Sequence, residues 1–235
     1  GKPVQRLWLQ SMTPQAIRDA LLKAGPGTQI LIAPGLYPIT QKLRLGQDGR
    51  ADAPIALRAE TPGTVWLAFD QVEGVLVDKP HWVFENLNIR GTCQRHDDCE
   101  HAFHVVGRAR HTRIRNNHIS DFNAHIKVNG SQGIWPDHGL LTYNTLTNSS
   151  PRSVSAPVVA FDLVGANHWK VQDNLVSDIV HTSAKWTTYG IYMKGASEGG
   201  RIERNLVVCT PERLSQPGLR VGISLGCGAT GQRFC

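Results

Sequence analysis

The chain has 235 residues, 40% of them hydrophobic, which suits a single domain with a substantial core. No apolar run is long enough to cross a bilayer, so the sequence excludes a membrane-spanning protein. The formal net charge of +6 favours an anionic partner. Because the chain has no run of basic residues and no nucleic-acid-binding motif, we expect that partner not to be nucleic acid.

The first predicted element is an amphipathic helix over residues 12–24. Pro14 suits its first turn, and Gly25 suits its end. The stretch ILIAPGLYPI (30–39) then predicts two short strands around a Pro-Gly turn. We expect the helix to cover the open end of a β-solenoid, whose coils occupy about residues 28–235.

Two phrases recur along the rest of the chain. One is a short β-rich segment containing an asparagine, and it repeats every 27 to 31 residues: Asn86, Asn117, Asn144, Asn174 and Asn205. Repetition at this period, without an intervening helical pattern, indicates a stack of β-coils. The asparagines fit an internal ladder of stacked amides at a tight turn, since Asn tolerates the left-handed conformation.

The second phrase is an alternating run that usually ends in glycine: 102–107, 125–130, 160–165, 190–195 and 222–227. Successive strand side chains point to opposite faces, so the apolar set lies inside. This interior set is Phe103/Val105, Ile126/Val128, Phe161/Leu163, Ile191/Met193 and Ile223/Leu225. The alternate positions then form an outward row of neighbours: His104, Lys127, Asp162, Tyr192 and Ser224.

At this point the chain resembles a known superfamily. AIRDALLKAGPGTQILIAPGLYPI, PIALRAETPGTVWL and the asparagine-marked coils are similar to the pectin-lyase-like right-handed parallel β-helix. The opening is most similar to polysaccharide lyases of the chondroitinase B and alginate lyase type. The resemblance covers nearly all of the chain and implies an all-β fold. It does not fix the activity, because the scaffold also carries hydrolases, epimerases, esterases and binding proteins.

The domain reading is a single β-helix over residues 1–235, with no linker. The sequence stops soon after its last coil, without an evident cap. We therefore expect either a fragment of a longer protein or an open end that a partner, including another copy, covers.

The cysteines predict two local disulfides, Cys93–Cys99 and Cys227–Cys235, and hence a secreted or periplasmic protein. Cys209 is left over, and we expect it to be buried and reduced. An alternative reading makes Cys93, Cys99 and the nearby His96 and His101 a zinc site. The acids of the same loop, Asp97, Asp98 and Glu100, are candidate ligands for a cation.

The outward row is the candidate active site. We expect His125 and Lys194 to face out beside Lys127, so that imidazoles, ammoniums, a carboxylate and a phenol converge. Such a set suits β-elimination from a uronic acid, which needs a base, a group that neutralises the sugar carboxylate, and a proton donor. Lys127 is the predicted base, and Lys194 or a bound calcium is the neutralising group. A structural ladder of salt bridges is the simpler alternative.

Proton donation falls to Tyr192 or His104, with Asp162 orienting one of its neighbours or binding calcium. The resemblance implies a lysine base and an arginine on consecutive coils, with calcium held by an asparagine and two closely spaced glutamates. In this chain no Glu-x-Glu pair precedes Lys127, and Asn148 stands where a basic residue is expected. The family's calcium ligands and arginine are therefore not carried over to this chain.

Further residues are predicted to line the groove and bind substrate: Asn129, Trp135, His138, Lys185 and Trp186. For Trp135 the alternative is a plug that packs onto the coil. The predicted function is β-elimination on an anionic polysaccharide. The alternatives are a non-catalytic carbohydrate-binding or cell-surface solenoid, and an epimerase or glycoside hydrolase on the same scaffold.

Overall fold

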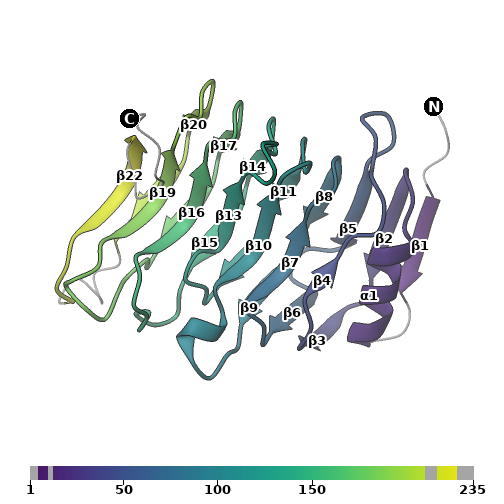
Figure 1. Cartoon of the computed structure of the whole chain (residues 1–235). Helices are drawn as coiled ribbons and strands as arrows, with labels where there is room; N and C mark the ends of the chain where they lie inside the picture. Colours follow the sequence, from purple (N-terminus) through teal and green to yellow (C-terminus); the bar gives the residue numbers. More distant parts are fainter. Residues whose placement is uncertain (1–4, 10–12, 210–215, 227–235) are drawn as a thin grey trace.

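The computed structural model describes residues 5–9, 13–209 and 216–226. In Figure 1 the chain winds into a parallel β-solenoid, with the strands of successive coils side by side from α1 to β22. Every pairing between named strands is parallel, as the repeats predicted. The predicted bond Cys227–Cys235 lies outside the described residues.

The coils build three sheets. Sheet A contains β1 (Gln5–Leu9), β2 (Thr28–Ile32), β5 (Ile55–Ala59), β8 (Trp82–Glu85), β11 (Arg113–Arg115), β14 (Leu140–Thr142), β17 (Lys170–Gln172) and β20 (Arg201–Glu203). Sheet B contains β3 (Gly35–Ile39), β6 (Val65–Phe69), β9 (Asn88–Gly91), β12 (His118–Ser120), β15 (Thr145–Thr147), β18 (Leu175–Ser177) and β21 (Leu206–Val208). Sheet C contains β4 (Leu43–Arg44), β7 (Glu73–Val77), β10 (His101–Val106), β13 (Ile126–Asn129), β16 (Val158–Val164), β19 (Thr188–Lys194) and β22 (Arg220–Gly226).

The amino-terminal helix is α1 (Pro14–Lys23), within the predicted range. The hydroxyl of Thr13 accepts a hydrogen bond from the Ala16 amide, which satisfies one donor of the first turn. Ile17 and Leu21 are fully buried in the same core as the coils. The helix therefore covers the first coil, as expected. Among the described residues, no helix has the length and apolar character needed to span a bilayer.

The predicted interior set of sheet C is confirmed from β10 to β19, where all eight side chains are buried. In β22 the same positions, Ile223 and Leu225, are 48% and 71% exposed. Cys209 follows β21 and is free but exposed, which corrects the expectation that it is buried. The reason is its position, since Cys209 follows β21, which is the end strand of sheet B in the part of the chain that the structure describes.

The asparagine ladder is real but begins one coil later than predicted. Each ladder side chain accepts a hydrogen bond from the backbone amide of the preceding coil, through Asn117, Asn144, Asn174 and Asn205. In the first of these coils the ladder position is Leu87, whose amide donates to Asn117 at 3.0 Å. Asn86 is therefore misaligned by one residue.

The left-handed conformation also belongs to the residue before each ladder position. That column has positive φ throughout: Asn86, Asn116, Tyr143, Asp173 and Arg204. The ladder asparagines themselves do not have positive φ. Their selection comes from hydrogen bonding inside the core, at about 1 kcal/mol for each bond, and not from tolerance of the left-handed conformation.

Candidate functional site

The outward row of sheet C has the predicted register. His104 pairs with Lys127, Lys127 with Asp162, Asp162 with Tyr192, and Tyr192 with Ser224. Adjacent parallel strands lie about 4.8 Å apart, so these side chains are direct neighbours. Together with Lys42, Glu73, Asn129 and Lys194, which contact them, they form what we call the sheet C patch.

Asp162 is the centre of one half of the patch. Lys127 Nζ donates to Asp162 Oδ2 at 2.7 Å, and Lys194 Nζ lies 3.1 Å from Oδ1. The Lys194 contact has the distance of an ion pair. Its geometry is not that of a hydrogen bond, since the buried Asp162 Oδ1 accepts no hydrogen bond. Lys194 also lies over the ring of Tyr192, 4.5 Å from its centroid. Asp162 thus holds two ammonium groups, one of them loosely.

His104 is the centre of the other half. Its Nδ1 lies 2.7 Å from Glu73 Oε1, and its Nε2 lies 2.6 Å from Asn129 Oδ1. Glu73 also pairs with Lys42 at 2.7 Å. A carboxylate on Nδ1 fixes the orientation and tautomer of an imidazole, as in many general-base histidines. The patch therefore holds a lysine and an oriented histidine on adjacent strands.

The charges of the patch do not cancel. Three lysines, Lys42, Lys127 and Lys194, face two carboxylates, Glu73 and Asp162, which leaves 3 − 2 = +1 before His104 is counted. The side chains of Lys127 and Lys194 are only 23% and 14% exposed. A half-buried excess of positive charge attracts an anionic ligand more strongly than solvated surface lysines do.

Two pKa values in the patch are displaced. Burial raises the pKa of Tyr192, and the neighbouring Tyr189 and Asp162 raise it further, so the phenol stays protonated at neutral pH. Burial alone would raise the pKa of Glu73, but hydrogen bonds and charges from Lys42 and His104 lower it below its usual value. Tyr192 is thus a proton donor and Glu73 an anion near neutrality.

His125 does not face outward, which corrects the prediction. It is fully buried, and its Nε2 bonds to the Thr147 carbonyl at 2.8 Å. Burial lowers its pKa to about 4, so the ring is neutral. The alternation failed here because β13 begins at Ile126. His125 precedes the strand, in the bend between sheets, where the period of two does not apply.

The predicted binding residues divide between several places. Asn129 belongs to the patch through His104. Trp135 packs against the core instead, with its indole over Gly130 and Gly165, where an added Cβ would lie about 2.5 Å from the ring. The plug alternative is thus supported. His138 lies between the rings of His111 and His168, away from the patch contacts just described.

The loop before β19 carries the other two predicted binding residues. Lys185 Nζ lies 5.1 Å above the ring of Trp186, which is tilted against His181. His181 Nε2 donates a hydrogen bond to the Val154 carbonyl at 2.7 Å, while its Nδ1 accepts from the Ser183 amide. These contacts place Lys185 and Trp186 beside the 151–157 loop, and their role in binding substrate stays a prediction.

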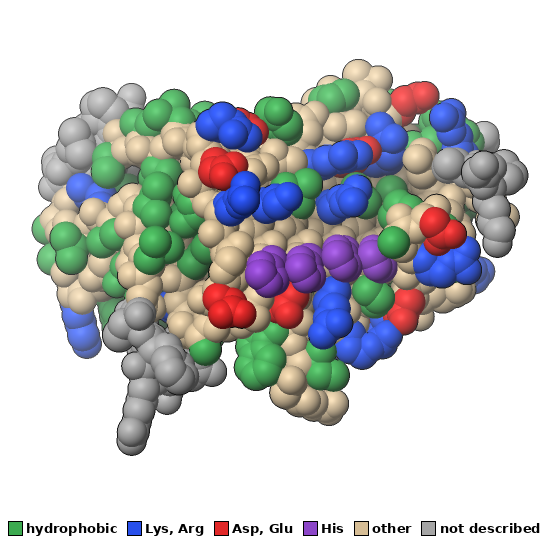
Figure 2. All heavy atoms as spheres, turned by 90° about the horizontal axis from the view of Figure 1, so that it is seen from above, with side chains coloured by type: hydrophobic (Ala, Val, Ile, Leu, Met, Phe, Trp, Pro, Cys, Tyr) green, Lys and Arg blue, Asp and Glu red, His purple; other side chains and the backbone are tan. Residues whose placement is uncertain are grey.

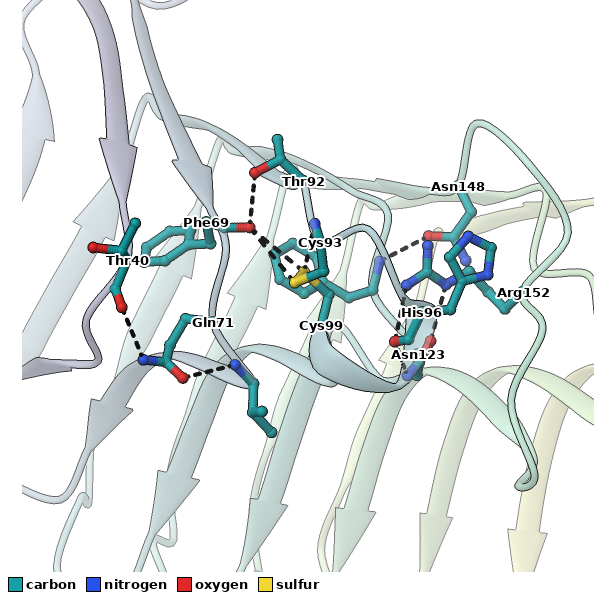
Figure 3. The surroundings of a disulfide bond; sticks show 12 residues. Thr40, Phe69, Gln71, Thr92, Cys93, His96, Cys99, Asn123, Asn148 and Arg152 are labelled. Atoms are coloured by element: carbon teal, nitrogen blue, oxygen red, sulfur yellow. Dashed lines mark hydrogen bonds between the residues drawn. A yellow bond between two sulfur atoms is a disulfide. The ribbon is translucent and has the colours of Figure 1, made fainter.

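The disulfide Cys93–Cys99 is confirmed, and it overturns the zinc alternative, because both thiols are consumed (Figure 3). His101 Nδ1 meanwhile bonds to the Ala124 carbonyl at 2.8 Å. The same region joins two loops. Buried Arg152 bonds to Asn123 at 2.9 Å, and His96 accepts from the Ser153 amide at 2.8 Å. The 151–157 loop is therefore tied to the disulfide loop.

The acids of the disulfide loop do not converge on a cation site. Asp97 is near Arg95 at 3.6 Å, Glu100 is near His101 at 3.6 Å, and Asp98 lies in the short helix η1 (His96–Asp98). Within the described ranges, no group of three or more His, Cys, Asp or Glu could hold a metal ion. Calcium also fits the sheet C patch poorly, because each of its carboxylates is already paired with two cationic or imidazole groups.

Sequence reasoning missed Glu73 and Lys42. Glu73 opens the run EGVLV, which alternates like the later runs but is not followed by glycine. A search for alternating runs that did not require a final glycine would have found Glu73. It lies 28 residues before His101, with which it pairs. Lys42 precedes the two-residue strand β4, which is too short to show a period.

The fold is shared with polysaccharide lyases. A mannuronic acid specific family 6 lyase from human gut microbiota has a TM-score of 0.50 and 14% identity over 86% of this chain and 58% of its own. A family 6 lyase from Pseudopedobacter saltans has a TM-score of 0.48 and 15% identity over 95% and 62%. An alginate lyase from Paenibacillus sp. str. FPU-7 has a TM-score of 0.41 and 12% identity over 96% and 100%.

This chain thus spans about three fifths of the two family 6 enzymes. No protein-family model matches the sequence. No curated protein sequence matches it either. At 12 to 15% identity these likenesses concern the fold alone. The chain is therefore a parallel β-solenoid of the architecture that family 6 polysaccharide lyases share.

Proposed function

We propose that the protein cleaves an anionic, uronic-acid-containing polysaccharide by β-elimination on the sheet C patch. The observation that carries the proposal is the row itself, in which an ammonium, a carboxylate, a phenol and an oriented imidazole occupy consecutive strands. The net positive charge suits an acidic polymer. The fold shared with polysaccharide lyases supports the proposal as a fold-level analogy.

The reaction removes the proton at C5 of a uronic acid, beside the carboxylate, and expels the oxygen linked at C4. The electron pair of the C5–H bond forms the new C4–C5 double bond, and the leaving oxygen takes up a proton. Negative charge develops on the sugar carboxylate in the transition state, so a cation placed there lowers the barrier. The elimination thus requires three groups, and the patch offers a candidate for each.

Lys194 neutralises the sugar carboxylate, because its contact with Asp162 is the looser of the two and can be exchanged for substrate. Lys127 accepts the C5 proton once it has lost its own, while Asp162 keeps its nitrogen in place. Tyr192, protonated near neutrality, donates to the leaving oxygen.

His104 is the second candidate base, favoured by its 2.7 Å contact with Glu73. If His104 is the base, His104→Gln should lose about 10² to 10⁴-fold in rate. Comparison of His104→Gln with Lys127→Ala therefore separates the two assignments.

The test is the ultraviolet absorbance of the unsaturated product on a panel of uronic acid polymers, with and without calcium. We expect Lys127→Ala to lose about 10² to 10⁴-fold in rate. Lys23→Ala, which removes an exposed lysine at the end of α1, is the matched control and should keep full activity. Full activity in Lys127→Ala would contradict the lysine-base assignment.

No product from the wild type on any polymer would contradict the elimination. Exchange of the C5 proton with deuterated solvent, without cleavage, would then identify an epimerase. Binding without exchange or cleavage would identify a non-catalytic carbohydrate-binding solenoid.

We also infer that the protein works in an oxidising compartment, secreted or periplasmic. The disulfide Cys93–Cys99 supports this, since such bonds persist outside the reducing cytosol. Mass spectrometry of the protein isolated from its native source, with free thiols alkylated, tests the inference. Alkylation of Cys93 and Cys99 would contradict it.

A further inference from the structure

Four histidines, His81, His111, His138 and His168, lie one above another along the solenoid. We call them the histidine stack. Their ring centroids are 4.7, 5.1 and 4.8 Å apart, and the ring planes differ by 5° to 12°. Figure 2 shows them as a continuous row on one face of the molecule, with Lys and Arg side chains alongside it. They lie in the turn that leads from sheet C into sheet A.

The turn does not by itself demand histidine. All four residues have positive φ, between 57° and 62°, as does Gly199 at the same place in the next coil. A second left-handed column of this solenoid, described above, holds asparagine, tyrosine, aspartate and arginine. Backbone bonds from each histidine amide to the next coil fix the turn whatever the side chain. The fourfold histidine therefore calls for an explanation beyond backbone conformation.

A metal ion does not explain the stack. Two nitrogens bound to one zinc ion at about 2.1 Å can be at most about 4.2 Å apart. Parallel rings with centroids 4.7 to 5.1 Å apart place equivalent nitrogens farther apart than that. The arrangement suits instead a ligand that extends along the axis and meets one imidazole on each coil.

A row of basic residues follows the stack on sheet A. Arg113, Lys170 and Arg201 occupy equivalent positions in β11, β17 and β20, with Leu140 of β14 between the first two, and all three are exposed. In the part of the chain that the structure describes, neither Arg113 nor Lys170 forms an ion pair with an acid; Arg201 Nη1 lies 3.7 Å from Glu203. Positive charge here is thus less compensated than in the sheet C patch.

Charged groups of both signs lie near the stack. Asp78 and Lys79, just before His81, pair with each other at 3.2 Å. Asp137 and Glu198 accept the amides of His111 and His168 through their backbone carbonyls, and the Asp137 carboxylate also accepts the Asn167 amide. Arg110 precedes His111.

We propose that the histidine stack and the row Arg113, Lys170 and Arg201 form a second binding strip for the anionic polysaccharide, one that binds more tightly at acidic pH. The choice of polymer rests on the proposed function. Four coils at about 4.8 Å give a strip about 14 Å long between the first and last ring, enough to meet several charged units of a polymer. An acidic polymer favours protonated imidazoles, so binding takes up protons.

The titration supports this direction. Burial lowers the pKa of His81 and His111, and the charges of Arg113 lower both further, so these rings are mostly neutral near pH 7 without ligand. A polyanion on the strip opposes those positive charges and raises the pKa of the rings. Protonation and binding then reinforce each other by linkage.

The test is calorimetric titration with a long alginate fraction, in a Lys127→Ala background so that nothing is cleaved. The strip variant is His111→Gln/His138→Gln/Lys170→Gln, and the control is His118→Gln/Lys23→Gln, which changes exposed groups elsewhere. At about pH 5.5 we expect the strip variant to bind about tenfold more weakly than the control. At about pH 8, where imidazoles are neutral, the difference should shrink. Thermal melting confirms that each variant is folded.

Titration in two buffers of different ionisation enthalpy should show proton uptake that the strip variant loses. Equal binding by the strip variant and the control would overturn the inference, and so would a loss seen with a DNA oligonucleotide but not with alginate. The product assay uses the wild type, with Lys127 intact. Unsaturated product from the wild type without strip-dependent binding would leave the lyase proposal standing alone. Strip-dependent binding without product from the wild type would overturn the lyase and keep the strip.

Discussion

The sheet C patch and the histidine stack are both ladders that the same repeat produces, yet they differ in what repeats. The patch places a different chemical group on each strand and balances most of its charge by ion pairs. The stack repeats one residue, next to three basic residues of which, within the described ranges, only Arg201 forms an ion pair with an acid. A row of unlike groups suits chemistry at one point of a ligand, whereas a row of like groups suits contact along its length.

The largest effect should come from removing the carboxylate that organises the patch. In Asp162→Asn the two lysines lose their common anion, and we expect the elimination rate to fall about 10³-fold. Steady-state rates measure this loss.

Asp173→Asn is the matched control for this variant, since Asp173 pairs with Arg204 on the surface, away from the patch. Its activity should equal that of the wild type. Wild-type activity in Asp162→Asn would show that the patch is a structural salt-bridge ladder, and its contrast with the stack would disappear.

The second effect concerns a histidine that differs from those of the stack, buried His125. Its pKa is about 4 in the folded protein and about 6.5 in the unfolded chain, so only the unfolded state gains a proton as pH falls between these values. Stability should therefore fall by about 3 kcal/mol from pH 6.5 to pH 4. Urea unfolding at several pH values measures this loss.

His125→Gln should unfold with a smaller pH dependence over that range, because the titrating group is gone. His118→Gln, an exposed histidine on β12, should keep the wild-type dependence. An unchanged pH dependence in His125→Gln would mean that other groups titrate in this window.

Much of the sheet C row could be predicted from the sequence, because strand alternation is a local property and the glycine-ended runs fixed its phase. The interior residues and the Lys127–Asp162 neighbourhood followed from that pattern, whereas the disulfide followed from the spacing of Cys93 and Cys99. The period stops at strand ends, which is why His125 was assigned to the wrong face and Asn86 to the wrong ladder position.

The histidine stack was not predicted because its residues stand in turns, where the strand alternation of period two does not apply. Their spacing follows the coil length, with gaps of 30, 27 and 30 residues from His81 to His168. The signal was therefore present as a single repeated residue, but ten histidines in the chain conceal it unless the coils are first aligned. Contacts such as Lys42–Glu73 depend on side-chain reach across strands, which no local pattern records.

The third effect tests how far charge balance stabilises the patch. Glu73→Gln removes the anion that Lys42 and His104 share, and we expect a loss of about 1 kcal/mol at neutral pH. The pKa of Glu73 is lowered on folding, so its contribution is present above about pH 4.3 and is lost as the pH falls further. Wild type and Glu73→Gln should thus converge in stability toward pH 3, as acid unfolding curves measure. A constant difference between them would contradict this assignment.

The smallest effect is expected at His138 of the stack. There, substitution by glycine and by alanine separates the contribution of the ring to stability from that of the backbone conformation. An exposed ring pair contributes roughly 0.5 to 1 kcal/mol, and a left-handed backbone costs an alanine about 1 kcal/mol more than a glycine. His138→Gly should therefore lie within about 0.5 kcal/mol of the wild type in urea unfolding, and His138→Ala about 1 kcal/mol below the glycine variant. If both variants instead lost more than about 2 kcal/mol, the imidazoles would be holding the coils together. The stack would then be a structural ladder like the buried asparagines. A ligand-binding surface should give the opposite result. The free energy of unfolding of His138→Gly should then be close to that of the wild type, while its binding to alginate is weaker.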